Sequence, residues 1–114
     1  MMIQHPLPDD LVELIAQRFQ ALADPTRIKL LDCIFVRGEA SVQELTEVVG
    51  STQQNVSRHL GVLRDAGIVR RRKVGNHAYY AIADERVFAL CEDVCGSLEE
   101  QYASLHGIVA GVRG

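Results

Sequence analysis

The sequence lacks the features that mark membrane and secreted proteins. None of its apolar runs approaches the roughly 18 residues that a membrane-spanning helix needs. The opening segment, MMIQHPLPDD, does not place a basic stretch before an apolar one, so no signal peptide is evident. We therefore expect a cytoplasmic protein with no membrane partner.

The chain has few cysteines, and their number is odd. The three cysteines are Cys33, Cys91 and Cys95, and none belongs to a Cys-x-x-Cys pair. A disulfide framework is therefore not expected, and we take the thiols to be reduced.

The usual signs of an enzyme are also missing. The sequence offers no nucleophile beside a plausible base, no glycine-rich phosphate loop and no paired carboxylates in a defined context. A chain of 114 residues has room for one compact domain, which we expect to span residues 1–114. A binding protein is the expected class.

Positive charge is concentrated in one segment of an otherwise acidic chain. The net charge is −3, yet residues 51–80 carry +5, which leaves −8 for the remainder. A solvated charge run would explain this pattern, but a local basic segment also fits an anionic partner such as nucleic acid. The basic residues are Arg58, Arg64, Arg70, Arg71, Arg72 and Lys73, opposed only by Asp65.

Apolar spacing and helix-start signals predict a mainly α fold with a β-hairpin. Asp24-Pro25 and Ser41 to Glu44 are typical helix starts, and Gly75-Asn76 suits a tight turn between two β-rich runs. The expected order is four helices, a hairpin and a last helix. The first helix covers about 9–23, a helix-turn-helix about 41–67, the hairpin about 68–82 and the last helix about 84–111.

The second helix of the helix-turn-helix, residues 52–66, presents polar side chains near its start. The amino-terminal part of a recognition helix enters the major groove, where Gln binds adenine and Arg binds guanine. An ordinary polar helix face is the alternative. The residues expected at DNA are Gln53, Gln54, Ser57, Arg58 and His59.

The hairpin that follows is a basic wing. Strand alternation places Arg71 and Lys73 on one face, with Arg70 and Arg72 on the other. Only one face can pack on the core, so some of these arginines must reach solvent or phosphate. We expect phosphate contacts from Arg71, Arg72 and Lys73, and a DNA contact from His77.

Four segments resemble the ArsR/SmtB repressor family over roughly residues 10–106. They are ALADPTRI at 21–28, QNVSRHL at 54–60, LRDAGIV at 63–69 and GNHAYYAI at 75–82. The resemblance implies a homodimeric winged helix-turn-helix repressor that binds palindromic double-stranded operator DNA and leaves it when an inducer binds. It also implies that the first and last helices form the dimer interface.

The two metal sites known in that family are not matched here. The family's Cys-x-Cys positions correspond to Ser41 and Gln43. Its last-helix site corresponds to Asp84, Arg86, Ser97 and Glu100, where both imidazoles are missing. Two carboxylates alone hold a transition metal poorly.

The cysteines offer a different sensor. Cys91 and Cys95 are four residues apart on a helix, too far apart for a disulfide but able to contact one thiophilic ion. With Cys33 they could hold As(III), Cd or Zn. A redox branch of the family has thiols in its second and last helices; Cys33 matches the first position, and Cys95 falls about one turn early. Packing alone is the third explanation.

The sequence thus predicts a homodimeric DNA-binding repressor released from its operator by an inducer sensed through thiols. A persulfide-responsive repressor of the same fold is the first alternative. A dimerisation module that has lost DNA binding is the second.

Overall fold

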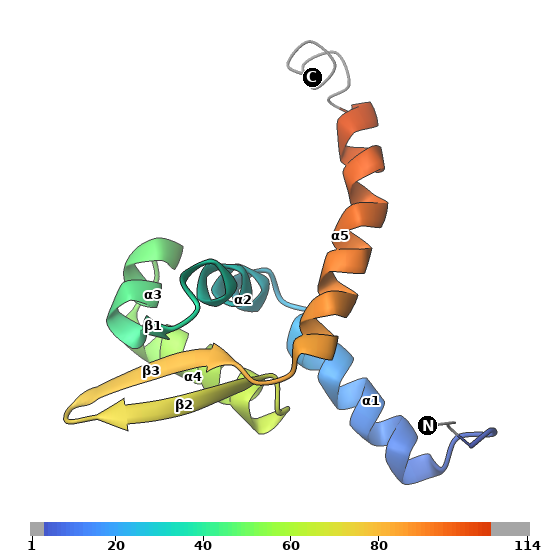
Figure 1. The fold of residues 1–114 in the computed structure, drawn as a ribbon, viewed down its shortest axis with the longest axis horizontal. Coiled ribbons are helices and arrows are strands. Elements are labelled where there is room, and N and C mark those ends of the chain that lie inside the picture. Colours follow the sequence, from blue (N-terminus) through green and yellow to red (C-terminus); the bar gives the residue numbers. More distant parts are fainter. Residues whose placement is uncertain (1–3, 106–114) are drawn as a thin grey trace. The chain divides into compact units, whose positions relative to one another are not determined.

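A computed structural model describes residues 4–105 of the chain, which fall into two compact units divided between Ala83 and Asp84. Figure 1 shows the elements. The order of four helices, a hairpin wing and a last helix is confirmed. The first unit contains α1 (Asp9–Leu22), α2 (Pro25–Arg37), β1 (Ala40–Ser41), α3 (Val42–Val49), α4 (Gln53–Asp65), β2 (Val69–Val74) and β3 (His77–Ile82); the second contains α5 (Glu85–Leu105).

The second and third helices begin where the sequence predicts. The carboxylate of Asp24 accepts the amides of Thr26 and Arg27 at 2.8 and 3.1 Å, with Pro25 as the first helical residue. At α3 the Ser41 hydroxyl accepts the Glu44 amide at 3.1 Å, and the Glu44 carboxylate accepts the Ser41 amide at 3.0 Å. Both caps satisfy amides that a helix start would leave unpaired.

The recognition helix and the last helix are capped as well. Thr52 caps α4 by accepting the amide of Asn55 at 3.1 Å. Asp84 accepts the amides of Arg86 and Val87 at 3.0 and 3.3 Å, which fixes the start of α5. The predicted last helix ran to about residue 111, and its final part lies outside the described residues.

The wing belongs to a three-stranded antiparallel sheet of order β1-β3-β2. Strand β1, which the sequence did not predict, pairs Ala40 with Tyr80 and Ser41 with Tyr79. Within the hairpin, Arg71 lies opposite Tyr80. The turn between the two long strands uses Gly75 at φ +59°, a backbone conformation that suits glycine. The short strand therefore joins the wing to the start of α3.

The core of the first unit fixes the position of α4. One side of α4 is fully buried through Val56, Leu60 and Leu63. They pack in a core with fully buried side chains of α2, α3 and the wing entry, and each such residue contributes about 1.5–3 kcal/mol to folding. The opposite side of α4 is left to solvent. The partners are Leu30, Ile34, Leu45 and Ile68.

Large apolar side chains remain exposed on several helices, α1 and α5 among them. On α5, Leu90, Val94, Leu98 and Tyr102 recur every four residues and are exposed. On α1 the exposed apolar residues are Val12, Leu14, Ile15 and Phe19. Over residues 4–105, no helix combines the length and apolar character needed to cross a membrane.

Candidate nucleic-acid interface

The solvent side of α4 carries the polar residues expected to contact DNA. Gln53, Gln54, Ser57 and Arg58 are all exposed, beside the buried stripe of Val56, Leu60 and Leu63. They lie in its first two turns, where helix amides also favour an anion. Four of the five predicted α4 residues therefore share an accessible surface.

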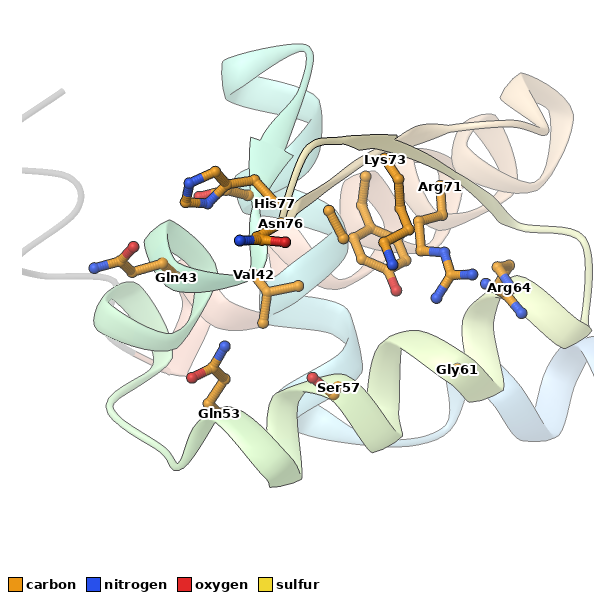
Figure 2. Close-up of a pocket in the computed structure, with 13 residues that line it drawn as sticks. Val42, Gln43, Gln53, Ser57, Gly61, Arg64, Arg71, Lys73, Asn76 and His77 are labelled. Carbon is orange, nitrogen blue, oxygen red and sulfur yellow. The ribbon is translucent and has the colours of Figure 1, made fainter.

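A hollow of about 490 Å³ lies between α4, the wing and the start of α3. Figure 2 shows Arg71 and Lys73 extending from the wing toward α4. Arg64 adds a third cation from α4, and no Asp or Glu is among the described residues that line the hollow. The remaining labelled lining residues are Val42, Gln43, Gln53, Ser57, Gly61, Asn76 and His77.

The three cations of the hollow are available to an external anion. Within residues 4–105, Arg64, Arg71 and Lys73 form no ion pair with the protein. His77 is exposed at the start of β3 and lines the same hollow. The geometry thus produces a concave surface of positive charge beside the reading face of α4.

The other face of the wing is occupied by contacts within the protein. Arg72 donates two hydrogen bonds to Glu39, from Nε at 3.1 Å and from an Nη at 2.7 Å. Its guanidinium also lies 5.3 Å from the ring centre of Tyr79. The hydrogen-bonded guanidinium lowers the pKa of Glu39, and the carboxylate in turn raises the pKa of Arg72. Arg70 donates to the carbonyl of Ile82 at 2.9 Å.

This arrangement argues for a correction to the role expected for Arg72, although its side chain stays 58% exposed. We grouped it with Arg71 and Lys73 as a phosphate contact, but it points to the opposite face of the strand and pairs with a carboxylate. Strand alternation separates these side chains correctly. The Glu39 partner lies 33 residues away in the sequence, so no local pattern announces it.

His59 requires a second correction. We expected it at DNA, yet it is buried, with 6% of its surface exposed. Its Nδ1 lies 3.0 Å from an Nη of Arg27. Burial lowers the pKa of His59, partly offset by the nearby Asp24 carboxylate. The imidazole faces the protein interior because its position borders the apolar side of α4.

Arg58 is held at the surface by a short chain of hydrogen bonds. An Nη of Arg58 donates to Asn55 Oδ1 at 2.7 Å, and Asn55 Nδ2 donates to Ser51 Oγ at 2.8 Å. A guanidinium has five N–H donors, so most remain for a base or phosphate. Asn55 therefore acts as an orienting residue for Arg58.

Several residues that line the hollow were not among the predicted site residues. Arg64 follows Ser57 by seven residues, so the two share a side of α4, and this spacing could have identified it. Gly61 lies between them on that side. Gln43 belongs to α3, and only the tertiary structure brings it to the hollow, so residue spacing could not have identified it.

The cysteines are divided between the two units. Cys33 is half-buried on α2, whereas Cys91 is half-buried and Cys95 exposed on α5. Burial raises the pKa of the Cys91 thiol. Among residues 4–105, no group of three or more His, Cys, Asp or Glu side chains is gathered closely enough to hold a metal ion.

Comparison with known proteins relates this geometry to characterised repressors. A family described as a helix-turn-helix domain matches residues 22–72. The HTH-type transcriptional regulator KmtR of Mycobacterium tuberculosis is 43% identical over 94 residues, which cover 82% of this chain and 72% of that protein. The arsenical resistance operon repressor of Bacillus subtilis is 36% identical over 87 residues, covering 75% of this chain and 83% of that protein.

A solved structure agrees with the sequence relatives. The homodimeric winged helix-turn-helix DNA-binding domain Mb0332 of Mycobacterium bovis is described as a possible ArsR-family transcriptional regulator. It matches this chain with a TM-score of 0.75 at 30% identity. The match covers 88% of this chain and 92% of that one.

Proposed function

The chain belongs to the ArsR/SmtB family of winged helix-turn-helix transcriptional repressors, and on that premise we propose that it is a homodimeric repressor whose α4 reads operator DNA. In this proposal the wing contacts the phosphate backbone, and an inducer bound through cysteine thiols releases the protein from DNA.

One observation carries the DNA-binding proposal: the exposed polar face of α4 borders a hollow lined by three cations that form no ion pair within residues 4–105. Gln53, Gln54 and Arg58 offer the bidentate groups that distinguish adenine and guanine in the major groove. Arg71 and Lys73 extend toward the same side. Phosphate contacts from the wing would set the register in which α4 meets the bases.

Exposed apolar side chains on α1 and α5 support a dimer. Both helices leave large hydrophobic residues in solvent, which is typical of a surface that meets a partner. A two-fold dimer would place the two copies of α4 about one DNA turn apart, ~34–36 Å, on a palindromic site.

The inducer proposal rests on the thiols of α5. Cys91 and Cys95 are one helical turn apart, and two thiolates suit a soft ion such as As(III), Cd or Zn. Cys33 is the remaining thiol that would complete a three-sulfur site. Because the pKa of Cys91 is raised, binding would require the ion to displace its proton.

A persulfide-responsive repressor is the second candidate. Its support is the exposure of Cys95 on α5, since an accessible thiol reacts more readily with an oxidant than a buried one. Cys33 would be its partner in this alternative.

DNA binding is tested by fluorescence anisotropy of the reduced protein on its own upstream DNA. Arg58→Gln is expected to weaken operator binding by roughly tenfold or more, because a bidentate base contact contributes about 1–3 kcal/mol. Lys29→Gln is the charge-matched control, since Lys29 is exposed on α2 and does not line the hollow. Absence of binding at low salt would refute the proposal and favour a dimerisation module.

The inducer is tested by adding arsenite, Cd²⁺, Zn²⁺ or a persulfide donor to the preformed complex. Release by a thiophilic ion that Cys91→Ser abolishes would support the metal-responsive repressor. Release by persulfide alone that Cys33→Ser abolishes would support the redox alternative. Tight binding that none of the four changes would refute thiol sensing and leave the cysteines as packing residues.

A further inference from the structure

The side chain of Arg27 connects three helices of the first unit. It lies in the first turn of α2. Its Nε donates to the carbonyl of Ala21 at 2.6 Å, and an Nη donates to the carbonyl of Gln20 at 3.2 Å. Both carbonyls belong to the end of α1. The other Nη lies 3.0 Å from Nδ1 of His59, on the recognition helix α4.

His59 stands out among the described residues because it is the one polar side chain that is buried. Arg27 can only donate, so the hydrogen bond requires Nδ1 to be the acceptor and the imidazole to be neutral. The charged groups nearest the ring are Arg27, Arg58 and Asp24; the Asp24 carboxylate caps α2. The contact is therefore one between a cation and a neutral ring held in a defined tautomer.

The position of His59 on α4 links this contact to the residues expected to meet DNA. Apolar packing through Val56, Leu60 and Leu63 holds one side of α4 in the core, and the hydrophobic effect itself is not directional. A hydrogen bond is directional. Because His59 is next to Arg58, a rotation of α4 at this point displaces the reading face.

We propose that Arg27 and His59 form a positioning pair that joins the end of α1 to the recognition helix and sets the angle at which α4 meets operator DNA. The inference rests on the proposed repressor function. In this proposal α1 and α4 move together, because the guanidinium of Arg27 is hydrogen-bonded to both helices. Neither residue touches DNA in this proposal.

Three substitutions separate a positioning role from simple packing. His59→Asn keeps a hydrogen-bond acceptor close to the place of Nδ1, whereas His59→Leu fills similar space without one. Arg27→Lys keeps the charge but loses the planar fork that reaches Gln20, Ala21 and His59 together. Operator and non-specific DNA affinities are measured for each by anisotropy, beside a thermal melt of the same sample.

The expected result is a specific loss of operator affinity. His59→Leu and Arg27→Lys should each lose about tenfold, the effect of one hydrogen bond to a charged group. Their non-specific affinity and salt dependence should match the parent, since no phosphate contact is removed. His59→Asn should recover most of the operator affinity. If His59→Leu does not fold, the operator affinities of Arg27→Lys and His59→Asn are compared instead, and they separate a positioning role from packing in the same way.

Two results would overturn the proposal. Variants that melt at lower temperature but bind the operator like the parent would show that the pair only stabilises the fold. A His59→Asn protein as impaired as His59→Leu would show that the acceptor is not the important feature. If the unaltered protein fails to bind any DNA at low salt, the repressor function itself fails, an outcome distinct from loss of the pair alone.

Discussion

Removing the cations that the wing directs toward α4 should change the salt dependence of DNA binding by a predictable amount. Arg71 and Lys73 line the hollow and form no ion pair with the part of the chain that the structure describes, so we expect each to neutralise one phosphate. Each such contact contributes about 0.9 to the slope of log affinity against log salt. A dimer presents two wings, so Arg71→Gln should lower the slope by ~1.8.

The consequence for affinity follows from this slope. Raising salt from about 50 to about 200 mM is a fourfold change, so the parent should lose roughly tenfold more affinity over that range than Arg71→Gln does. The double variant with Lys73→Gln should lower the slope by ~3.6. Anisotropy titrations of labelled operator at four or five salt concentrations give these slopes directly.

Arg72→Gln is the matched control for this experiment. Arg72 follows Arg71 in the same strand and carries the same charge, but its guanidinium is hydrogen-bonded to Glu39. Its removal should leave the salt slope nearly unchanged. Equal slopes for Arg72→Gln and Arg71→Gln would refute the assignment of the two faces, as would an unchanged slope for Arg71→Gln.

Further predictions concern stability and thiol reactivity. Gly61→Ala should stabilise the protein by about 0.5–1 kcal/mol, because Gly61 lies within α4 and a Cβ there meets nothing within 4 Å. The melting temperature should rise by a few degrees, and a lower melting temperature would contradict this reasoning. Ser41→Ala should cost about 1 kcal/mol in urea unfolding through loss of the α3 cap, and no change would show that the cap is dispensable. In the folded protein the pKa of His59 is lowered from 6.5, so just below that pH the unfolded chain binds more protons than the folded one. The free energy of unfolding should therefore fall as the pH drops below about 6.5. His59→Asn should flatten this dependence of stability on pH. Because burial raises the pKa of Cys91, its alkylation should be slow at pH 7 and accelerate strongly above pH 9; fast reaction at neutral pH would contradict the raised pKa.

Local signals were sufficient to predict most of the elements. Asp24-Pro25 and Ser41 to Glu44 satisfy helix amides with neighbouring side chains, so their effect can be read from a few consecutive residues. The wing was predictable because Gly75 permits the turn between two β-rich runs. Strand β1 was missed because two residues carry no periodicity, and it exists only through pairing with β3.

The accessible site residues were predictable in outline, whereas the partners of two side chains were not. Helix and strand periodicity placed Gln53, Ser57 and Arg71 on an accessible surface, as the structure has them. The contacts of His59 and Arg72 within the protein were missed because their partners, Arg27 and Glu39, lie 32 and 33 residues away in the chain. Polarity alone indicates exposure, which holds for Arg72 although it pairs with Glu39, but not for His59, which is buried.

Ser41 has a double role that limits how the chain can vary in length. It is the last residue of β1, paired with Tyr79, and also the N-cap of α3, whose first residue is Val42. No residue separates strand from helix, so a one-residue insertion or deletion here would shift either the sheet register or the helix cap. Length changes between relatives should therefore fall elsewhere, at the Gly38 corner or the Gly75 turn, where a Cβ would meet nothing within 4 Å.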